Sequence, residues 1–254
     1  IVRKSDGGYG YAATDIAAVK YRIDDLHADR IIYVVGMPQS THFAQVFAVA
    51  RMAGYLPDGV PAEHVAFGSV LGADGKMLRT REGRTVTLQS LLDEAEEVAA
   101  RPIAMAAVKY ADLSNQLQKD YTFDVDRMTA TTGDTGPYLQ YAHARASRIL
   151  RRAEDEGLTW GAVTRLDEPA EQALALLLTR FGEVVALVGA ELQPHKLCTY
   201  LFEVATAMST FYEQCPVLRS EGEVRSSRLA LCATTRKVLA TGLGLLGIEA
   251  PDLM

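Results

Sequence analysis

The hydrophobic pattern changes near residue 88, and this change constrains the fold more than any other feature of the sequence. Before it, Arg30–Gly36 is a continuous apolar run that ends in glycine, which is typical of a buried parallel strand. Thr41–Met52 has the apolar face of a helix, and Glu63–Leu71 is a second apolar run. Beyond residue 88, apolar side chains recur with helical spacing as far as Leu246. We therefore predict an α/β fold built on a βαβ unit, followed by an all-α bundle.

This pattern predicts an α/β part over residues 1–87, a helical connector over residues 88–125 and a helical bundle over residues 126–254. The chain opens on Ile1 instead of a methionine, and its first residues already have the pattern of a strand and a glycine turn. We predict a hairpin there, then a helix capped by Thr14 and Asp15. We also expect a preceding segment to be missing.

The charge balance limits the partners of the chain. With 26 basic and 32 acidic side chains, its net charge of -6 argues against bulk attraction to nucleic acid, so any such site must be local. No apolar run approaches the roughly 18 residues of a membrane span. We predict a soluble, cytoplasmic protein without membrane contact. The cysteines lack the spacing of a zinc site, so we expect no metal ligands in the chain.

A glycine-punctuated basic loop follows the second apolar run and contains Lys76, Arg79 and Arg81. Cations on such a loop, next to a βαβ unit, suit the developing charge on a triphosphate's leaving group. The alternative is a solvated surface loop, which composition alone favours.

A βαβ unit forms a ligand crevice at the carboxyl ends of its strands, here next to Gly36. Tyr11 and Asp15 lie four residues apart before the first strand, and Gln39 and His42 follow it. A carboxylate with a tyrosine and a glutamine suits a planar cation such as a guanidinium. Each residue also has a structural alternative: Asp15 as a helix cap, Tyr11 in cross-strand packing and His42 as an ordinary helix histidine.

A window without acidic residues, Gly136–Arg152, is the local basic feature of the chain. Helical spacing places Tyr141, Arg145, Arg148 and Arg152 on one face. Exposed aromatic side chains can stack on unpaired bases while arginines contact phosphates. The alternative is that the tyrosines of this window pack inside the bundle.

In order and spacing, the sequence resembles the class I arginyl-tRNA synthetases over essentially its whole length. The stretches that resemble the catalytic domain are Arg3–Tyr9, Tyr11–Ala17, Tyr33–Gly36 with Gln39, His42–Phe43 and Gln45, and His64–Gly68. Those that resemble the anticodon-binding domain are Gly133–Arg145, Pro194–His195, Tyr200–Leu201, Phe211–Tyr212, Cys215–Leu218, Arg228–Leu231 and Gly247–Met254.

The resemblance implies the carboxyl-terminal half of such an enzyme: the second half of a Rossmann-type catalytic domain, with a degenerate second class I signature loop at residues 76–81, and a helical anticodon-binding domain. It carries functional roles onto matching positions. Arginine binding falls on Tyr11, Asp15 and Gln39. ATP binding falls on Gly36, His64, Phe67 and Val70, and catalysis on Lys76, Arg79 and Arg81. Contacts to tRNA fall on Tyr138, Tyr141, Arg145, Arg148, Arg152, Tyr212 and Met254.

The sequence departs from the family pattern at the first class I signature. The paired histidines of the first class I signature are absent, since all five histidines are isolated. The resemblance therefore implies an arginine–tRNA ligase fragment that uses ATP with Mg²⁺, binds arginine and its tRNA, and is inactive without its amino-terminal half. The alternatives are a non-catalytic paralogue that binds tRNA or senses arginine, and a class I synthetase specific for another amino acid.

Overall fold

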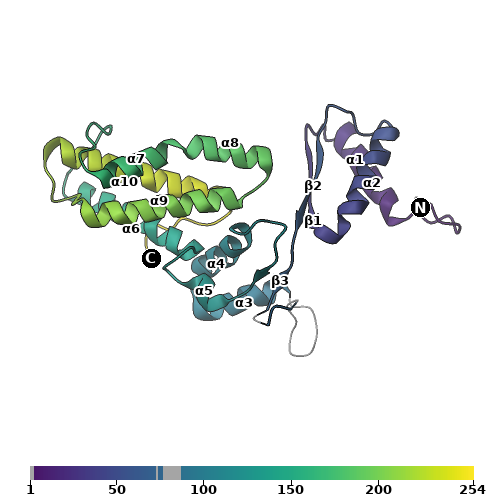
Figure 1. Ribbon diagram of the computed structural model, residues 1–254, viewed down its shortest axis with the longest axis horizontal. Coiled ribbons are helices and arrows are strands. Elements are labelled where there is room, and N and C mark those ends of the chain that lie inside the picture. Colours follow the sequence, from purple (N-terminus) through teal and green to yellow (C-terminus); the bar gives the residue numbers. More distant parts are fainter. Residues whose placement is uncertain (1–2, 73, 77–86) are drawn as a thin grey trace. The chain divides into compact units, whose positions relative to one another are not determined.

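The computed structural model describes residues 3–72, 74–76 and 87–254 of the chain. Contacts between residues divide the protein into two compact units (Figure 1). The first comprises Ile1–Ser69 and Leu117–Asp120. The second comprises Val70–Gln116 and Tyr121–Met254. This division groups residues 88–116 with the bundle, whereas the sequence-based boundaries at residues 87 and 125 stay predictions.

The first unit contains the predicted βαβ unit. Its regular elements are α1 (Tyr11–Asp24), β1 (Ile31–Gly36), a 3-10 turn (Met37–Gln39), α2 (Ser40–Met52) and β2 (Ala62–Phe67). Strands β1 and β2 pair in parallel, with Ile31 opposite Ala62 and Gly36 opposite Phe67. Both helices pack on one face of this sheet (Figure 1), where Val19, Ile31 and Val46 are buried together.

The other face of β1 is apolar, and no described helix of this unit packs on it. Side chains of a strand alternate between its two faces, so Ile32 and Val34 point away from the helices. They are 41% and 63% exposed. A strand that is apolar on both sides is typical of a sheet covered on both faces. Strand β1 therefore has the sequence of a strand that is buried on both faces, whereas the helices of this unit cover only one face.

The start of the first unit differs from the predicted hairpin. A single antiparallel bridge joins Arg3 to Tyr9, and α1 already begins at Tyr11, with Gly10 as its N-cap. The predicted cap at Thr14 and Asp15 is therefore wrong: Asp15 lies inside α1. Because residues four apart share one face of a helix, Tyr11 and Asp15 lie on the same face of α1.

The predicted second strand, Glu63–Leu71, is divided in the structure. Strand β2 ends at Phe67, and β3 (Val70–Leu71) pairs in parallel with β4 (Tyr121–Thr122) in the second unit. Between them, the Gly68 amide donates to the Leu117 carbonyl and the Ser69 amide donates to Asp120 Oδ1. A Cβ on residue 68 would lie 2.7 Å from the backbone of Lys119, which explains the glycine at this division.

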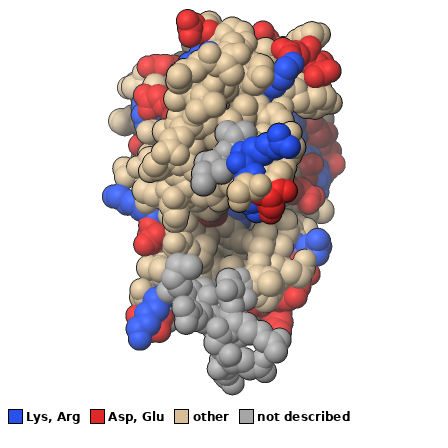
Figure 2. All heavy atoms as spheres, turned by 90° about the vertical axis from the view of Figure 1, so that its right-hand side faces the viewer, with Lys and Arg blue, Asp and Glu red and all other residues tan. Residues whose placement is uncertain are grey.

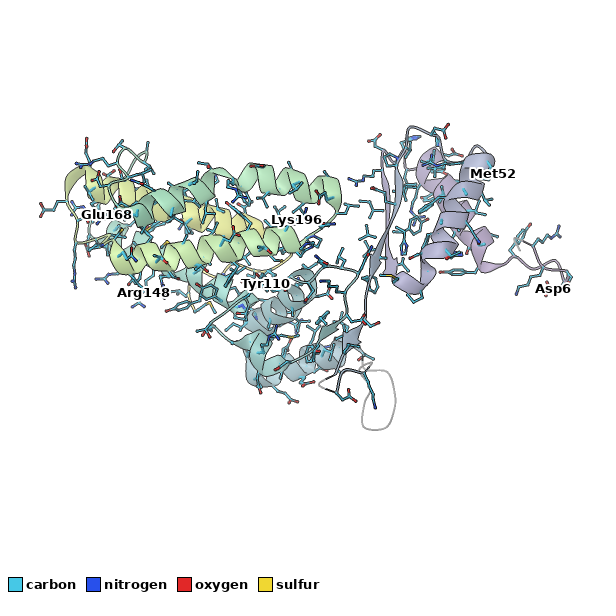
Figure 3. All side chains as sticks on the ribbon, in the orientation of Figure 1. Asp6, Met52, Tyr110, Arg148, Glu168 and Lys196 are labelled. Atoms are coloured by element: carbon cyan, nitrogen blue, oxygen red, sulfur yellow. The ribbon has the colours of Figure 1, made fainter. Side chains whose placement is uncertain are left out.

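The second unit is helical, as predicted. Its helices are α3 (Leu88–Val98), α4 (Arg101–Leu113), α5 (Val125–Thr129), α6 (Gly136–Asp155), α7 (Pro169–Thr179), α8 (Phe181–Glu191), α9 (His195–Gln214) and α10 (Gly222–Leu245). Its main core joins α4 and α6–α10. Tyr110 of α4, labelled in Figure 3, has its hydroxyl 2.5 Å from Asp134 Oδ1 and 3.1 Å from the Cys198 carbonyl oxygen, so its one proton is donated to these two acceptors together.

Helix α6 is fixed closely against α4. Thr135 caps it by accepting a hydrogen bond from the Tyr138 amide, and Pro137 occupies its first turn. A Cβ on Gly136 would lie 2.3 Å from the Ala106 carbonyl oxygen, so only glycine permits this approach. The start of α6 is therefore set by tertiary packing as well as by its cap.

Helices α7 and α8 form the most apolar stretch of the described chain. By length and composition alone, Pro169–Glu191 is suited to cross a membrane. The two helices are separated at Arg180, and 11 residues each give about 16 Å at 1.5 Å per residue, well short of a bilayer core of about 30 Å. Leu174 and Leu178 instead lie in the core of the bundle. The absence of a membrane partner stays a prediction.

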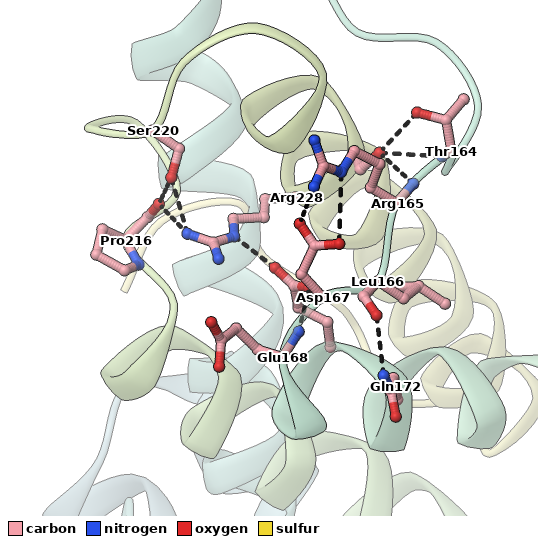
Figure 4. Close-up of polar contacts among 11 residues, drawn as sticks. Thr164, Arg165, Leu166, Asp167, Glu168, Gln172, Pro216, Ser220 and Arg228 are labelled. Atoms are coloured by element: carbon pink, nitrogen blue, oxygen red, sulfur yellow. Dashed lines mark hydrogen bonds and ion pairs between the residues drawn. The ribbon is translucent and has the colours of Figure 1, made fainter.

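A buried ion pair joins α7 to α10 (Figure 4). Arg228 Nε donates to Glu171 Oε1 at 2.5 Å, and these side chains are 10% and 3% exposed. The Arg228 guanidinium also donates to the Pro216 carbonyl at 3.0 Å and to Ser220 Oγ at 2.8 Å. Glu171 Oε2 accepts from the Glu168 amide at the start of α7. The pair thus fixes the loop between α9 and α10.

Candidate functional site

Side chains from α1 and α2 meet at the carboxyl end of β1. Tyr11 Oη donates to Gln39 Oε1 at 3.2 Å, and Asp15 Oδ2 lies 2.7 Å from His42 Nε2. A carboxylate only accepts hydrogen bonds, so Nε2 of this histidine carries the proton that it donates. The predicted arginine-binding residues are therefore adjacent, and the Asp15 side chain is largely buried.

His42 is predicted to lie at the crevice, with an ordinary helix histidine as the alternative, but it has no predicted role in binding arginine or ATP. Besides bonding to Asp15, its ring lies 4.9 Å from the Tyr11 ring and 5.2 Å from the Phe43 ring, measured between centroids. The signal in the sequence is its place in the first turn of the helix after β1, at the strand end where a crevice is predicted.

The predicted nucleotide-binding residues of the first unit follow this cluster. The Phe43 ring lies 5.0 Å from the His64 ring, and His64 Nε2 donates to the Val35 carbonyl at 2.8 Å. Phe67 is exposed and lies opposite Gly36 on the neighbouring strand. A Cβ on Gly36 would make only ordinary contacts at 3.7 Å, so packing leaves room above this residue.

Tyr33 lies next to this cluster. Arg22 Nη1 donates to its hydroxyl at 3.1 Å, and the guanidinium lies over the ring. Burial raises the pKa of Tyr33 most, while the positive charge of Arg22 acts in the opposite direction. The hydroxyl therefore stays neutral next to the carboxylate of Asp15 at physiological pH.

Two of the remaining predicted residues of the catalytic part belong to the second unit. Val70 lies in β3 and Lys76 in a turn after it, both in the second unit. The Lys76 side chain is exposed, and its amide donates to Asp74 Oδ1. Arg79 and Arg81 lie outside the described residues.

The predicted RNA-binding residues of α6 form its accessible strip. Most of this helix is buried, whereas Tyr141, Arg148 and Arg152 are exposed and Tyr138 and Arg145 are partly exposed. Arg148 projects from α6 away from the core (Figure 3). Elsewhere, on the face that Figure 2 presents, basic and acidic side chains are dispersed among uncharged ones. The strip of α6 contains Arg145, Arg148 and Arg152, and no acidic residue lies in the window Gly136–Arg152.

Tyr138 is a partly enclosed member of the strip. Its ring packs 5.7 Å from the Phe202 ring, and its hydroxyl lies 3.3 Å from Ser209 Oγ. Tyr141 and Tyr212 are 41% and 47% exposed, so these two tyrosines present their rings to solvent.

The carboxyl-terminal tail lies along another side of α6. Gln140 Nε2 donates to the Glu249 carbonyl, His143 Nδ1 donates to the Pro251 carbonyl, and Ser147 Oγ donates to Asp252. The bond from Ser147 is the main cause that holds the pKa of Asp252 below its usual value. These bonds direct the tail to its end at Met254, which is 49% exposed.

Two family models match this chain. One is described as tRNA synthetases class I (R), catalytic domain, and matches residues 1–103. The other, the DALR anticodon binding domain, matches residues 139–254. The fold and both matches define a segment of a class I tRNA synthetase catalytic domain joined to an anticodon-binding domain.

Individual relatives make the assignment more specific. The chain is 65% identical to the arginine–tRNA ligase of Cutibacterium acnes and 52% identical to that of Thermobifida fusca, with all of this chain matching 48% and 47% of their lengths. It superposes on the Thermus thermophilus arginyl-tRNA synthetase with a TM-score of 0.86 at 30% identity, covering 100% of this chain and 50% of that one. The chain belongs to the arginyl-tRNA synthetase family and corresponds to its carboxyl-terminal part, about half the length of the relatives it matches.

Proposed function

We propose that this chain supplies part of the arginine and ATP sites, and the anticodon-binding domain, of an arginine–tRNA ligase. The main observation in support of this proposal is the cluster at the carboxyl end of β1, where Tyr11, Asp15 and Gln39 lie together. The complete enzyme then works in two steps. The carboxylate of arginine attacks the α-phosphate of ATP and pyrophosphate leaves. A ribose hydroxyl of the terminal adenosine of the tRNA then captures the adenylate. Family membership supports a cytoplasmic location.

Asp15 is the proposed partner of the substrate guanidinium. Only its Oδ2 is bonded to His42, and an ionised carboxylate offers about four acceptor positions, so capacity remains for a cation. Tyr11 and Gln39 provide a phenol and an amide that are hydrogen-bonded to each other next to this carboxylate. His42 fixes the orientation of the Asp15 side chain from α2.

ATP binding is proposed for Gly36, His64, Phe67 and Val70 on the basis of family resemblance, with the adenine against His64 and Phe67. The bond from His64 to the Val35 carbonyl fixes its ring at the strand end. Lys76, Arg79 and Arg81 are proposed to contact the phosphates from a loop in the place of the second class I signature. Within the described residues, no three metal-ligating side chains lie together, so we assign no step to a magnesium ion held by the chain.

The amino-terminal half of a class I catalytic domain is the proposed partner of the first unit. The chain spans about half the length of its curated relatives, and the face of β1 away from α1 and α2 carries Ile32 and Val34. Packing against a further layer would remove this apolar surface from water. The same partner would supply the first class I signature.

Replacing Asp15 tests the arginine site. In the enzyme assembled from both halves, we expect Asp15→Asn to lower kcat/KM for arginine at least about tenfold, because a charge-assisted pair with the guanidinium is lost while the shape is kept. Asp24→Asn changes an exposed carboxylate on the same helix and is expected to leave kcat/KM unchanged. Equal values for both variants in steady-state aminoacylation would leave Asp15 a structural residue only and favour a different substrate.

Salt titrations test the tRNA site. The affinity of the chain for arginine tRNA should fall with salt by a slope of about 0.7 to 0.9 per phosphate contact. We expect Arg148→Gln to reduce this slope by about one contact, for any RNA. Tyr141→Ala should weaken binding with little change in slope, and reduce discrimination against other tRNAs, because stacking is lost without charge.

Arg165→Gln is the control for the salt titrations, since it removes a charge outside the strip of α6. It is expected to leave both slope and affinity unchanged. If all three variants matched the wild type, tRNA contact through α6 would be excluded, and an arginine sensor without RNA binding would become the better proposal.

A further inference from the structure

Arg145 differs from the other arginines of the α6 strip in what surrounds it. The central carbon of its guanidinium lies 4.7 Å from the ring centroid of Tyr141 and 5.0 Å from that of Tyr212. Tyr141 stands one turn earlier on α6, whereas Tyr212 stands near the end of α9. One guanidinium therefore contacts two exposed aromatic rings from two different helices.

A hydrogen bond fixes the guanidinium further. Arg145 Nη1 donates to Ser209 Oγ at 3.4 Å, and the same oxygen lies 3.3 Å from Tyr138 Oη. Ser209 stands one turn before Tyr212 on α9. By contrast, Arg148 and Arg152 are exposed side chains. Arg145 is thus held within the protein's own contacts, while its neighbours on the strip extend into solvent.

We propose that Arg145 is a positioning residue, which holds the rings of Tyr141 and Tyr212 as one ordered stacking surface for unpaired RNA bases and does not itself contact phosphate. This inference rests on the proposed tRNA binding and assigns a different task to one of its residues. The proposed RNA-binding residues then fall into three groups: those that stack on bases, the one that supports the stacking rings, and those that contact phosphate.

The physical basis is the shape of the guanidinium. It is planar and stacks on aromatic rings, which the compact ammonium of lysine does less well. Two exposed tyrosines without support would lose side-chain freedom when a base stacks on them, and this loss reduces affinity. Arg145 orders both rings before RNA arrives. Consistent with this contact, Arg145 holds the pKa of Tyr141 below its usual value, chiefly through hydrogen bonding.

The first test compares two variants that each remove one positive charge from α6, Arg145→Gln and Arg148→Gln. The probe is the anticodon stem-loop of arginine tRNA, titrated at several salt concentrations. We expect Arg145→Gln to weaken binding roughly tenfold, with a change in salt slope less than half of that caused by Arg148→Gln. Equal changes in slope would show that Arg145 contacts phosphate and would overturn the inference.

A double-mutant cycle tests whether Arg145 acts through the tyrosines. If it does, Arg145→Gln will weaken binding much less when Tyr212 is already alanine, because the supported ring is gone. Arg148→Gln should cost the same fold in affinity with either residue at position 212. Additive effects of Arg145→Gln and Tyr212→Ala would contradict a positioning function.

A measurement without RNA separates this inference from the proposed function. In spectra of the chain with labelled tyrosines, the ring resonances of Tyr141 and Tyr212 should both shift in Arg145→Gln and stay in place in Arg148→Gln. Ring resonances that do not change in Arg145→Gln would overturn the inference even if the wild type binds tRNA. If the rings shift but the wild type binds no stem-loop, the proposed tRNA function fails and the positioning function fails with it.

Discussion

We expect the chain alone to catalyse no arginine-dependent exchange of pyrophosphate into ATP, with or without tRNA. The candidate arginine and ATP residues of the first unit lie next to a sheet of only two paired strands among the described residues, and the histidines of the first class I signature are absent from the sequence. Catalysis requires groups that stabilise the transition state from all sides. Because removing a single such donor costs about 10²–10³ in rate, the loss of several should exceed about 10³.

Exchange should return when the amino-terminal half of the enzyme is supplied, whether as a separate polypeptide or as an upstream fusion. The assembled enzyme with Asp15→Asn is the control for exchange that depends on the candidate arginine site of this chain. Exchange by the isolated chain that is well above background and requires arginine would contradict the prediction. It would also mean that other residues of this chain replace the first signature.

The parts of the fold that depend on local pattern could be predicted from the sequence. The continuous apolar run of β1 and the amphipathic α2 led directly to the βαβ unit that the structure contains. The helical spacing of α6 placed Tyr141 and Arg148 on its accessible strip. In each case one element's own periodicity determines which side chains face outward.

Features that depend on distant segments could not be predicted in this way. The predicted strand Glu63–Leu71 divides after β2 because its backbone amides donate hydrogen bonds to Leu117 and Asp120, about fifty residues further along the chain. The stack around Arg145 needs Tyr212 from α9. The bond between Asp15 and His42 joins two helices, and a single sequence gives no measure of that distance. Such contacts are set by tertiary packing, which overrides local preference.

The buried pair of Arg228 and Glu171 gives the largest expected effect on stability. We expect Glu171→Ala to lower the free energy of unfolding of the helical bundle by about 3–5 kcal/mol, because it leaves the Arg228 charge buried without its partner. The variant also removes the acceptor for the Glu168 amide. Denaturant unfolding followed by the fluorescence of Trp160, the single tryptophan, would measure this, since its side chain packs against the main core of the bundle.

Asp167→Ala is the matched control, since it breaks the nearby pair with Arg165, in which both side chains are about half exposed (Figure 4). Exposed pairs contribute only about 0.2–1 kcal/mol, so this variant should unfold close to the wild type. The double variant Glu171→Met with Arg228→Met removes both charges and should recover part of the loss, because no buried charge remains unpaired. Equal destabilisation by Glu171→Ala and Asp167→Ala would show that burial adds nothing. A double variant less stable than Glu171→Ala would instead assign the effect to the bonds of Arg228 with Pro216 and Ser220.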